Sequence, residues 1–171
     1  MQPNTQTTRR FDPAVIAGGI AIVANTLALR LADAIPLTTA RGGLLRLLTQ
    51  WLAAPAEWSG VAAFWAEHGL PGAQSALVQT GFHLLVGLAM ALVYAYGIEP
   101  FGPGGSWRKG IAYALVVWLL NAAVVLPATG EGFAGSAHLA LAGMLWFAGA
   151  HTLFFVLLAV VYDRLKRRSM S

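Results

Sequence analysis

The sequence contains no cysteine, and few of its residues are charged. Without cysteine the chain cannot form disulfides or thiolate metal sites, and it cannot carry out thiol catalysis. Charged residues make up 11% of the chain, whereas soluble domains have about 25%. The chain is instead rich in apolar residues, because 57% are hydrophobic and the mean hydropathy is +0.64. These proportions indicate a membrane protein.

Four apolar stretches are each long enough to cross a bilayer. A helix rises 1.5 Å per residue, so about 20 apolar residues cross a hydrocarbon core. The stretches are residues 13–35, 74–96, 109–127 and 139–162. Because four spans leave no room for a separate soluble domain in 171 residues, we expect a single membrane domain over the whole chain. The predicted fold class is therefore all-α, an integral membrane four-helix bundle.

Basic residues are distributed unevenly between the two sides of such a bundle. One side carries Arg9, Arg10, Arg108, Lys109, Arg164, Lys166, Arg167 and Arg168, and the loops of the other side carry Arg41 and Arg46. The positive-inside rule then places both termini in the cytoplasm. The same rule accounts for the net charge of +4, so we expect no nucleic-acid partner. The bilayer is the expected partner, with other membrane subunits as a further option.

The segment 36–73 between the first two spans does not resemble a linker. Leucines and Trp51 fall on one helical face before Pro55, which is expected to end that helix and to begin the next. After it, Trp58 and Trp65 belong to a pattern of apolar residues at i, i+3, i+4 and i+7. We interpret the segment as two short amphipathic helices anchored at the membrane interface by tryptophan, which either cap the bundle or form a docking surface or lid.

A polar layer is expected near the middle of the membrane. Asn25, His83, Asn121 and His151 each lie roughly 14 to 18 Å into a different span when depth is counted along the helix. Polar side chains at this depth normally face the interior of the bundle. Three interpretations remain open: interhelical hydrogen bonding, a proton or ligand site, and a b-type haem or metal site that uses His83 and His151.

An internal repeat accompanies this layer. His83 and Tyr94 are separated by ten residues, as are His151 and Tyr162, and each pair follows a span that contains an asparagine at mid-depth. The chain is therefore interpreted as two helical hairpins of parallel topology. Both tyrosines fall where an aromatic belt at the cytoplasmic interface would place them, so we expect them to act as interfacial anchors.

Titratable residues also occur on the external side. His68 and His138 are expected near the outer surface, where Glu67, Glu131 and Asp33 could approach them. Histidines in such positions can sense pH, although solvated surface residues are the more common case.

The motifs HLLVG at 83–87 and WLLNAAVVLPATGEGF at 118–133, with the histidine and trailing aromatic of 151–162, resemble small bacterial inner-membrane proteins of the YagU-like group. The resemblance covers residues 80–163. It implies a four-helix fold and a location in the inner membrane, and it supplies neither an activity nor a catalytic residue.

The sequence lacks any set of nucleophile and base, so no catalytic residue is assigned and no cofactor is predicted. The leading functional hypothesis is a non-enzymatic membrane protein, either an accessory subunit or a stress-related membrane factor. The alternatives are a haem-binding electron-transfer protein that uses His83 and His151, and a small transporter with a polar site at mid-membrane.

Overall fold

The computed structural model describes residues 5–35, 37–40 and 43–168, and within this part of the chain the regular structure is entirely helical. Four of the described helical segments are long and apolar enough to cross a membrane, which agrees with the four predicted spans. They are Arg10–Ala34, Ala76–Ile98, Ser106–Ala128 and Leu141–Arg168, and each overlaps one of the expected spans.

The helices that form these spans are α1 (Thr5–Ala34), α4 (Ala76–Val93), α5 (Ser106–Leu120) and α7 (Leu141–Arg168). Two of them are extended by π-helical turns. η1 (Tyr94–Ile98) continues α4, and η2 (Asn121–Val125) continues α5 into the short helix α6 (Leu126–Ala128). A single π-helical turn inside a long helix often marks a functional position.

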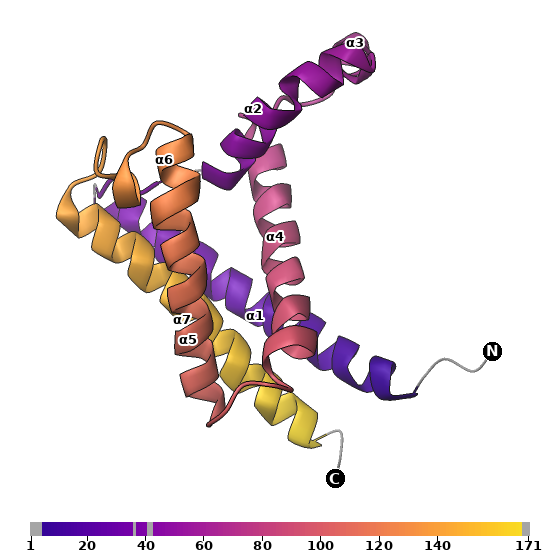
Figure 1. Ribbon diagram of the computed structural model, residues 1–171, viewed down its shortest axis with the longest axis vertical. Coiled ribbons are helices and arrows are strands. Elements are labelled where there is room, and N and C mark those ends of the chain that lie inside the picture. Colours follow the sequence, from indigo (N-terminus) through magenta and orange to yellow (C-terminus); the bar gives the residue numbers. More distant parts are fainter. Residues whose placement is uncertain (1–4, 36, 41–42, 169–171) are drawn as a thin grey trace.

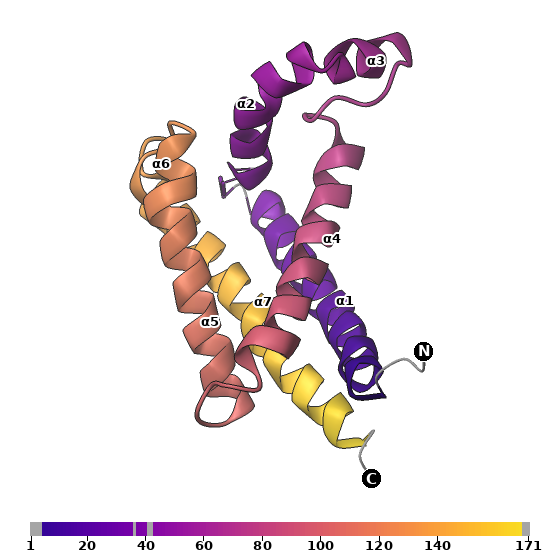
Figure 2. The ribbon, with the colours of Figure 1, turned by 45° about the vertical axis from the view of Figure 1, so that its right-hand side comes forward.

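Figures 1 and 2 show how the long helices are arranged. α1 and α7 pack against each other at the centre, α4 packs on α1, and α5 packs on α7. The start of α1, the loop 99–105 and the end of α7 lie at one end of the bundle, which we call the termini end. The opposite end, which holds the segments 37–75 and 129–140, is the insert end. Among the described residues, α5 approaches α4 through η1, near the termini end, and the two helices do not pack along their lengths.

Glycines allow the flanking helices to approach the central pair closely. A Cβ atom added to Gly87 of α4 would lie 2.6 Å from Ile22 Cδ1 of α1. At Gly110 of α5, an added Cβ atom would lie 2.8 Å from the backbone of α7 at Phe155 and Val156. Contacts below 3.0 Å would force the backbone or a neighbour to move, so these positions require glycine for close packing.

The main cluster of buried apolar residues lies toward the termini end, where aromatic rings from η1, α5 and α7 meet. Tyr94 and Tyr162 pack edge to face with ring centroids 5.7 Å apart, and Tyr113 packs against Phe155 at 4.4 Å. The structure therefore differs from the expectation that Tyr94 and Tyr162 are interfacial anchors, because both are 0% exposed. Their rings fill the space where α4, α5 and α7 converge, and in this position they pack against each other and not against headgroups.

The insert contains two helices, α2 (Gly43–Trp58) and α3 (Val61–Glu67). The expected break at Pro55 is wrong, because Pro55 lies inside α2 and the helix continues to Trp58. The chain turns instead at Gly60, whose φ of 77° is readily adopted only by glycine. An exposed proline near a helix end removes only one hydrogen bond, and this is tolerated more easily than a break in the core.

Together α2 and α3 form an arm that extends past the outer ends of α4 and α5 (Figures 1 and 2). Its tryptophans are exposed, with Trp58 at 93%, Trp51 at 64% and Trp65 at 45%. Their role as interfacial anchors stays a prediction.

Candidate functional site

The first candidate site is a hydrogen-bonded group centred on Asn25 of α1. Asn25 is 1% exposed, and its side chain has partners on two other helices. Asn25 Nδ2 donates to the carbonyl oxygen of Ala150 on α7 over 2.8 Å, and Asn25 Oδ1 accepts from His83 Nε2 on α4 over 3.0 Å. The expected interhelical hydrogen bond within the polar layer is therefore present. The depth of this group in a membrane stays a prediction.

The same group determines which nitrogen of His83 carries the proton. Because Asn25 Nδ2 must face the Ala150 carbonyl oxygen, Asn25 Oδ1 faces His83 and can only accept. His83 therefore bears its proton on Nε2 in the neutral form, and its Nδ1 atom is left as the acceptor.

His151, which follows Ala150 on α7, forms its hydrogen bond through the other ring nitrogen, Nδ1. Its Nδ1 atom donates to the carbonyl oxygen of Phe147 over 2.8 Å, and the His151 and Phe147 rings lie 4.2 Å apart. The proton on Nδ1 leaves Nε2 of His151 as the acceptor. Asn121, the fourth expected member, is half-buried at the first residue of η2. Within the described part of the chain, no hydrogen bond joins its side chain to the other three residues.

These donors can be compared with the requirements of a bis-histidine haem. A histidine ligand commonly donates from one ring nitrogen to a carbonyl oxygen and coordinates through the other. His151 meets this pattern through its bond to Phe147. His83 meets it as well, because its Nε2 atom donates to the amide oxygen of Asn25 and its Nδ1 atom is left as the acceptor. The two histidines therefore present different ring nitrogens as acceptors, Nδ1 of His83 and Nε2 of His151, and we derive no electron-transfer step from them.

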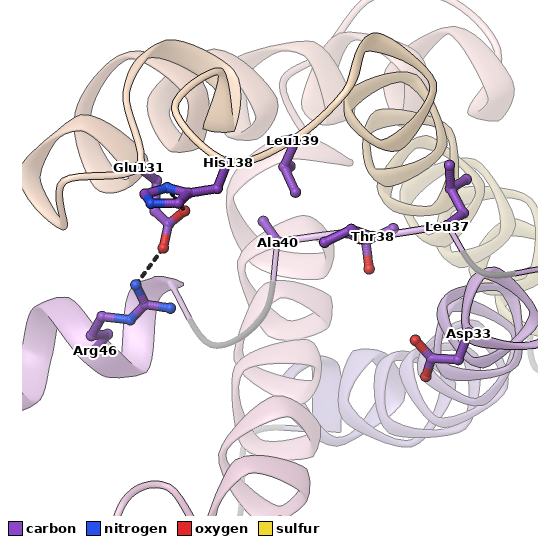
Figure 3. Close-up of a pocket in the computed structure, with 9 residues that line it drawn as sticks. Asp33, Leu37, Thr38, Ala40, Arg46, Glu131, His138 and Leu139 are labelled. Atoms are coloured by element: carbon purple, nitrogen blue, oxygen red, sulfur yellow. Dashed lines mark hydrogen bonds and ion pairs between the residues drawn. The ribbon is translucent and has the colours of Figure 1, made fainter.

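A second candidate site lies at the insert end, around Glu131. The Glu131 side chain is 14% exposed and forms an ion pair with Arg46 of α2, and His138 Nδ1 lies 3.0 Å from Glu131 Oε2 (Figure 3). The approach of Glu131 to His138 agrees with the sequence expectation. The pairing with Arg46 was not foreseen, because no local pattern relates residues 85 positions apart.

The backbone of the loop explains why Glu131 points inward. Gly130 and Gly132, which flank it, have φ angles of 82° and 72°, a conformation that glycine adopts at little cost. Two backbone hydrogen bonds then fix Glu131, from its nitrogen to Leu126 O over 2.9 Å and from Ala137 N to its oxygen over 2.9 Å.

An open hollow of about 570 Å³ lies beside this ion pair. It is lined by Asp33, Leu37, Thr38, Thr39, Ala40, Arg46, Glu131, His138 and Leu139. In Figure 3 Asp33 lies on the far side of the segment 37–40 from Glu131 and His138, so the acidic groups do not converge on one point.

A third polar cluster lies at the termini end and is centred on Glu99. Glu99 Oε1 accepts from Lys166 Nζ of α7 over 2.8 Å, and Arg10 Nη1 of α1 lies 3.6 Å from Glu99 Oε2. Lys109 Nζ of α5 donates to the backbone oxygen of Glu99 over 2.6 Å. One residue that follows α4 and η1 therefore contacts the three other long helices. Sequence analysis did not single out Glu99, and the surrounding excess of basic residues was the available signal.

Comparisons with protein-family models, with curated proteins and with solved structures found no match for this chain. The YagU-like resemblance therefore stays a prediction.

Proposed function

We propose that this chain is a multi-pass protein of the bacterial inner membrane that acts, without enzymatic chemistry, as an accessory subunit of a larger membrane assembly. Four apolar helices support the membrane placement. The basic residues of the termini end support an orientation with both termini in the cytoplasm.

The observation that carries the subunit proposal is the incomplete cover of α5. Tyr113, Val117, Leu120 and Val124 recur at intervals of three or four residues, so they lie along one face of the helix. Tyr113 is 6% exposed near the termini end, whereas Leu120 is 57% and Val124 is 52% exposed toward the insert end. The face that is buried at one end is therefore open at the other. We call the open part, with the facing side of α4, the α4–α5 seam.

The burial of α4 supports the same interpretation. Of the most apolar 18 residues in the span Ala76–Ile98, 11% are buried, whereas the value is 33% for the spans of α1 and α7. Few residues of α4 are therefore buried in the core, and its main contact with another long helix is with α1. An apolar helix of another subunit that enters the α4–α5 seam would cover both flanking helices at once. Lipid alone could cover the same surface, so the experiment must separate the two.

Site-specific photo-crosslinking in native membranes makes this distinction. A photoreactive residue at position 120 should give a protein adduct of one discrete mass. Leu115 provides the matched control, because it is 55% exposed but five residues away, on the opposite side of α5. Adducts with lipid alone at both positions would contradict the proposal. An adduct between two differently tagged copies would identify the partner as a second copy of this chain.

A haem-binding electron-transfer protein is the second candidate, and the arrangement of His151 favours it. The Nε2 atom of His151 is left as an acceptor by the bond to Phe147. Bound haem would supply one-electron redox chemistry. An absorption spectrum of the purified protein decides the matter, since a Soret band that is lost in His83→Ala and in His151→Ala would support haem. Colourless protein would remove this candidate.

A further inference from the structure

Three buried polar atoms at the termini end have no hydrogen-bond partner in the part of the chain that the structure describes. They are the hydroxyl oxygens of Tyr94 and Tyr162 and the Oε2 atom of Glu99, and none of them has a hydrogen bond among the described residues. Both tyrosines are 0% exposed. Buried polar groups are nearly always hydrogen-bonded, and exceptions are commonly explained by a bound water or ion. Three such atoms in one region therefore require a common explanation.

The three atoms lie in the same part of the core. The Tyr94 and Tyr162 rings are in contact, with centroids 5.7 Å apart. Glu99 lies beside both, because its backbone nitrogen donates to Tyr94 O over 2.8 Å and its side chain binds Lys166, which is one helical turn after Tyr162 on the same face of α7. The two carboxylate oxygens of Glu99 also differ. Oε1 accepts from Lys166 Nζ over 2.8 Å, whereas Oε2 is 3.6 Å from Arg10 Nη1, which is too long for a direct hydrogen bond.

The surrounding charges select the kind of group that can lie between these atoms. A cation is disfavoured because Arg10, Lys109 and Lys166 already surround Glu99. An anion is disfavoured because it would face the Oε2 atom of Glu99, which carries negative charge. A neutral molecule that both donates and accepts hydrogen bonds meets neither objection.

We propose that ordered water binds at this point and bridges the hydroxyl groups of Tyr94 and Tyr162 to Glu99 Oε2. A water molecule that accepts from both hydroxyl groups and donates to the carboxylate forms three hydrogen bonds, the usual number for buried water. The bridge would connect the Glu99 cluster to the aromatic core between α4 and α7.

The proposal is tested by whether Tyr94→Phe and Tyr162→Phe raise or lower the melting temperature. If water bridges the three atoms, Tyr94→Phe and Tyr162→Phe should each lower the melting temperature in detergent by about 2–4 °C, because each removes a hydrogen bond. The double variant should lose less than the sum, since both hydroxyl groups bind the same water. If the hydroxyl groups are unpaired, phenylalanine removes a desolvated polar atom and the melting temperature should rise or stay unchanged. That result would overturn the proposal.

Tyr113→Phe provides the matched control, because the Tyr113 hydroxyl donates directly to Met90 O over 3.3 Å. Its loss calibrates the effect of a single hydrogen bond in the same core.

Two further measurements that compare the unmodified protein with Tyr94→Phe identify the bound group. An infrared O–H stretching band that shifts in H₂¹⁸O and disappears in Tyr94→Phe would support water. The difference in melting temperature between the unmodified protein and Tyr94→Phe should be the same in sodium, potassium or choline chloride and in sodium gluconate. Dependence on the cation or on chloride would assign the site to that ion and would overturn the proposal.

Discussion

His83 Nε2 donates a hydrogen bond to Asn25 Oδ1 over 3.0 Å, and Asn25 in turn donates to the carbonyl oxygen of Ala150. This pair of residues joins α4 to α1, while the second bond of Asn25 joins α1 to α7. Loss of Asn25 would therefore break the contacts of α1 with both α4 and α7, whereas loss of His83 would break only the contact between α4 and α1.

The first prediction concerns the order of stability within this group. Asn25→Leu should destabilise the protein more than His83→Leu, because it removes two interhelical hydrogen bonds that are each worth about 0.6 to 2 kcal/mol. His83→Gln should retain part of the stability, since an amide nitrogen can also donate to Asn25. Thermal unfolding in a mild detergent gives the ranking. Asn121→Leu is the control and should have a smaller effect, so a loss as large as that of Asn25→Leu would contradict this account.

The second prediction concerns the ion pairs of Glu131. Glu131→Gln removes the charge that faces Arg46 and His138, and it should lower stability by about 0.2 to 1 kcal/mol, because the Arg46 and His138 side chains are 38% and 65% exposed. The effect should shrink in about 1 M salt, which screens such pairs. The exposed Glu57→Gln on α2 serves as the control. An effect of Glu131→Gln that is independent of salt would show that the carboxylate acts through packing.

The third prediction tests the close approach of α5 and α7. Gly110→Ala places a Cβ atom 2.8 Å from the α7 backbone, so α5 must move away and stability should fall by about 1–3 kcal/mol. Gly149→Ala is the matched change on α7, because its Cβ atom would meet nothing within 4 Å and alanine favours a helix. Equal melting temperatures for the two variants would be inconsistent with the packing described.

The parts of the fold that were predictable from the sequence depend on local information. The lengths of the apolar stretches predict four spans. Counting residues along each span places Asn25 and His83 at the same depth, without any knowledge of which helices are in contact. Pro55 was misinterpreted because propensity predicts a helix end, whereas the exposed position tolerates the missing hydrogen bond.

The unpredicted parts depend on contacts between distant segments. Tyr94 and Tyr162 have the spacing of interfacial residues, yet both are buried, because η1 packs against α1 and α5 and the Tyr94 ring contacts Tyr162 of α7. The contacts of Glu99 with Arg10 and Lys166, like the pairing of Arg46 with Glu131, come from helix packing that charge patterning does not specify.

The fourth prediction tests the central claim of a four-span protein with both termini in the cytoplasm. Because the chain has no cysteine, single cysteines can be introduced at Ser59, Ser136 and Ser171 and labelled in intact cells with a membrane-impermeant thiol reagent. Ser59 and Ser136 lie in the segments of the insert end and should be labelled. Ser171 should be labelled only after the membrane is permeabilised. Labelling of Ser171 in intact cells together with Ser59 would contradict the account.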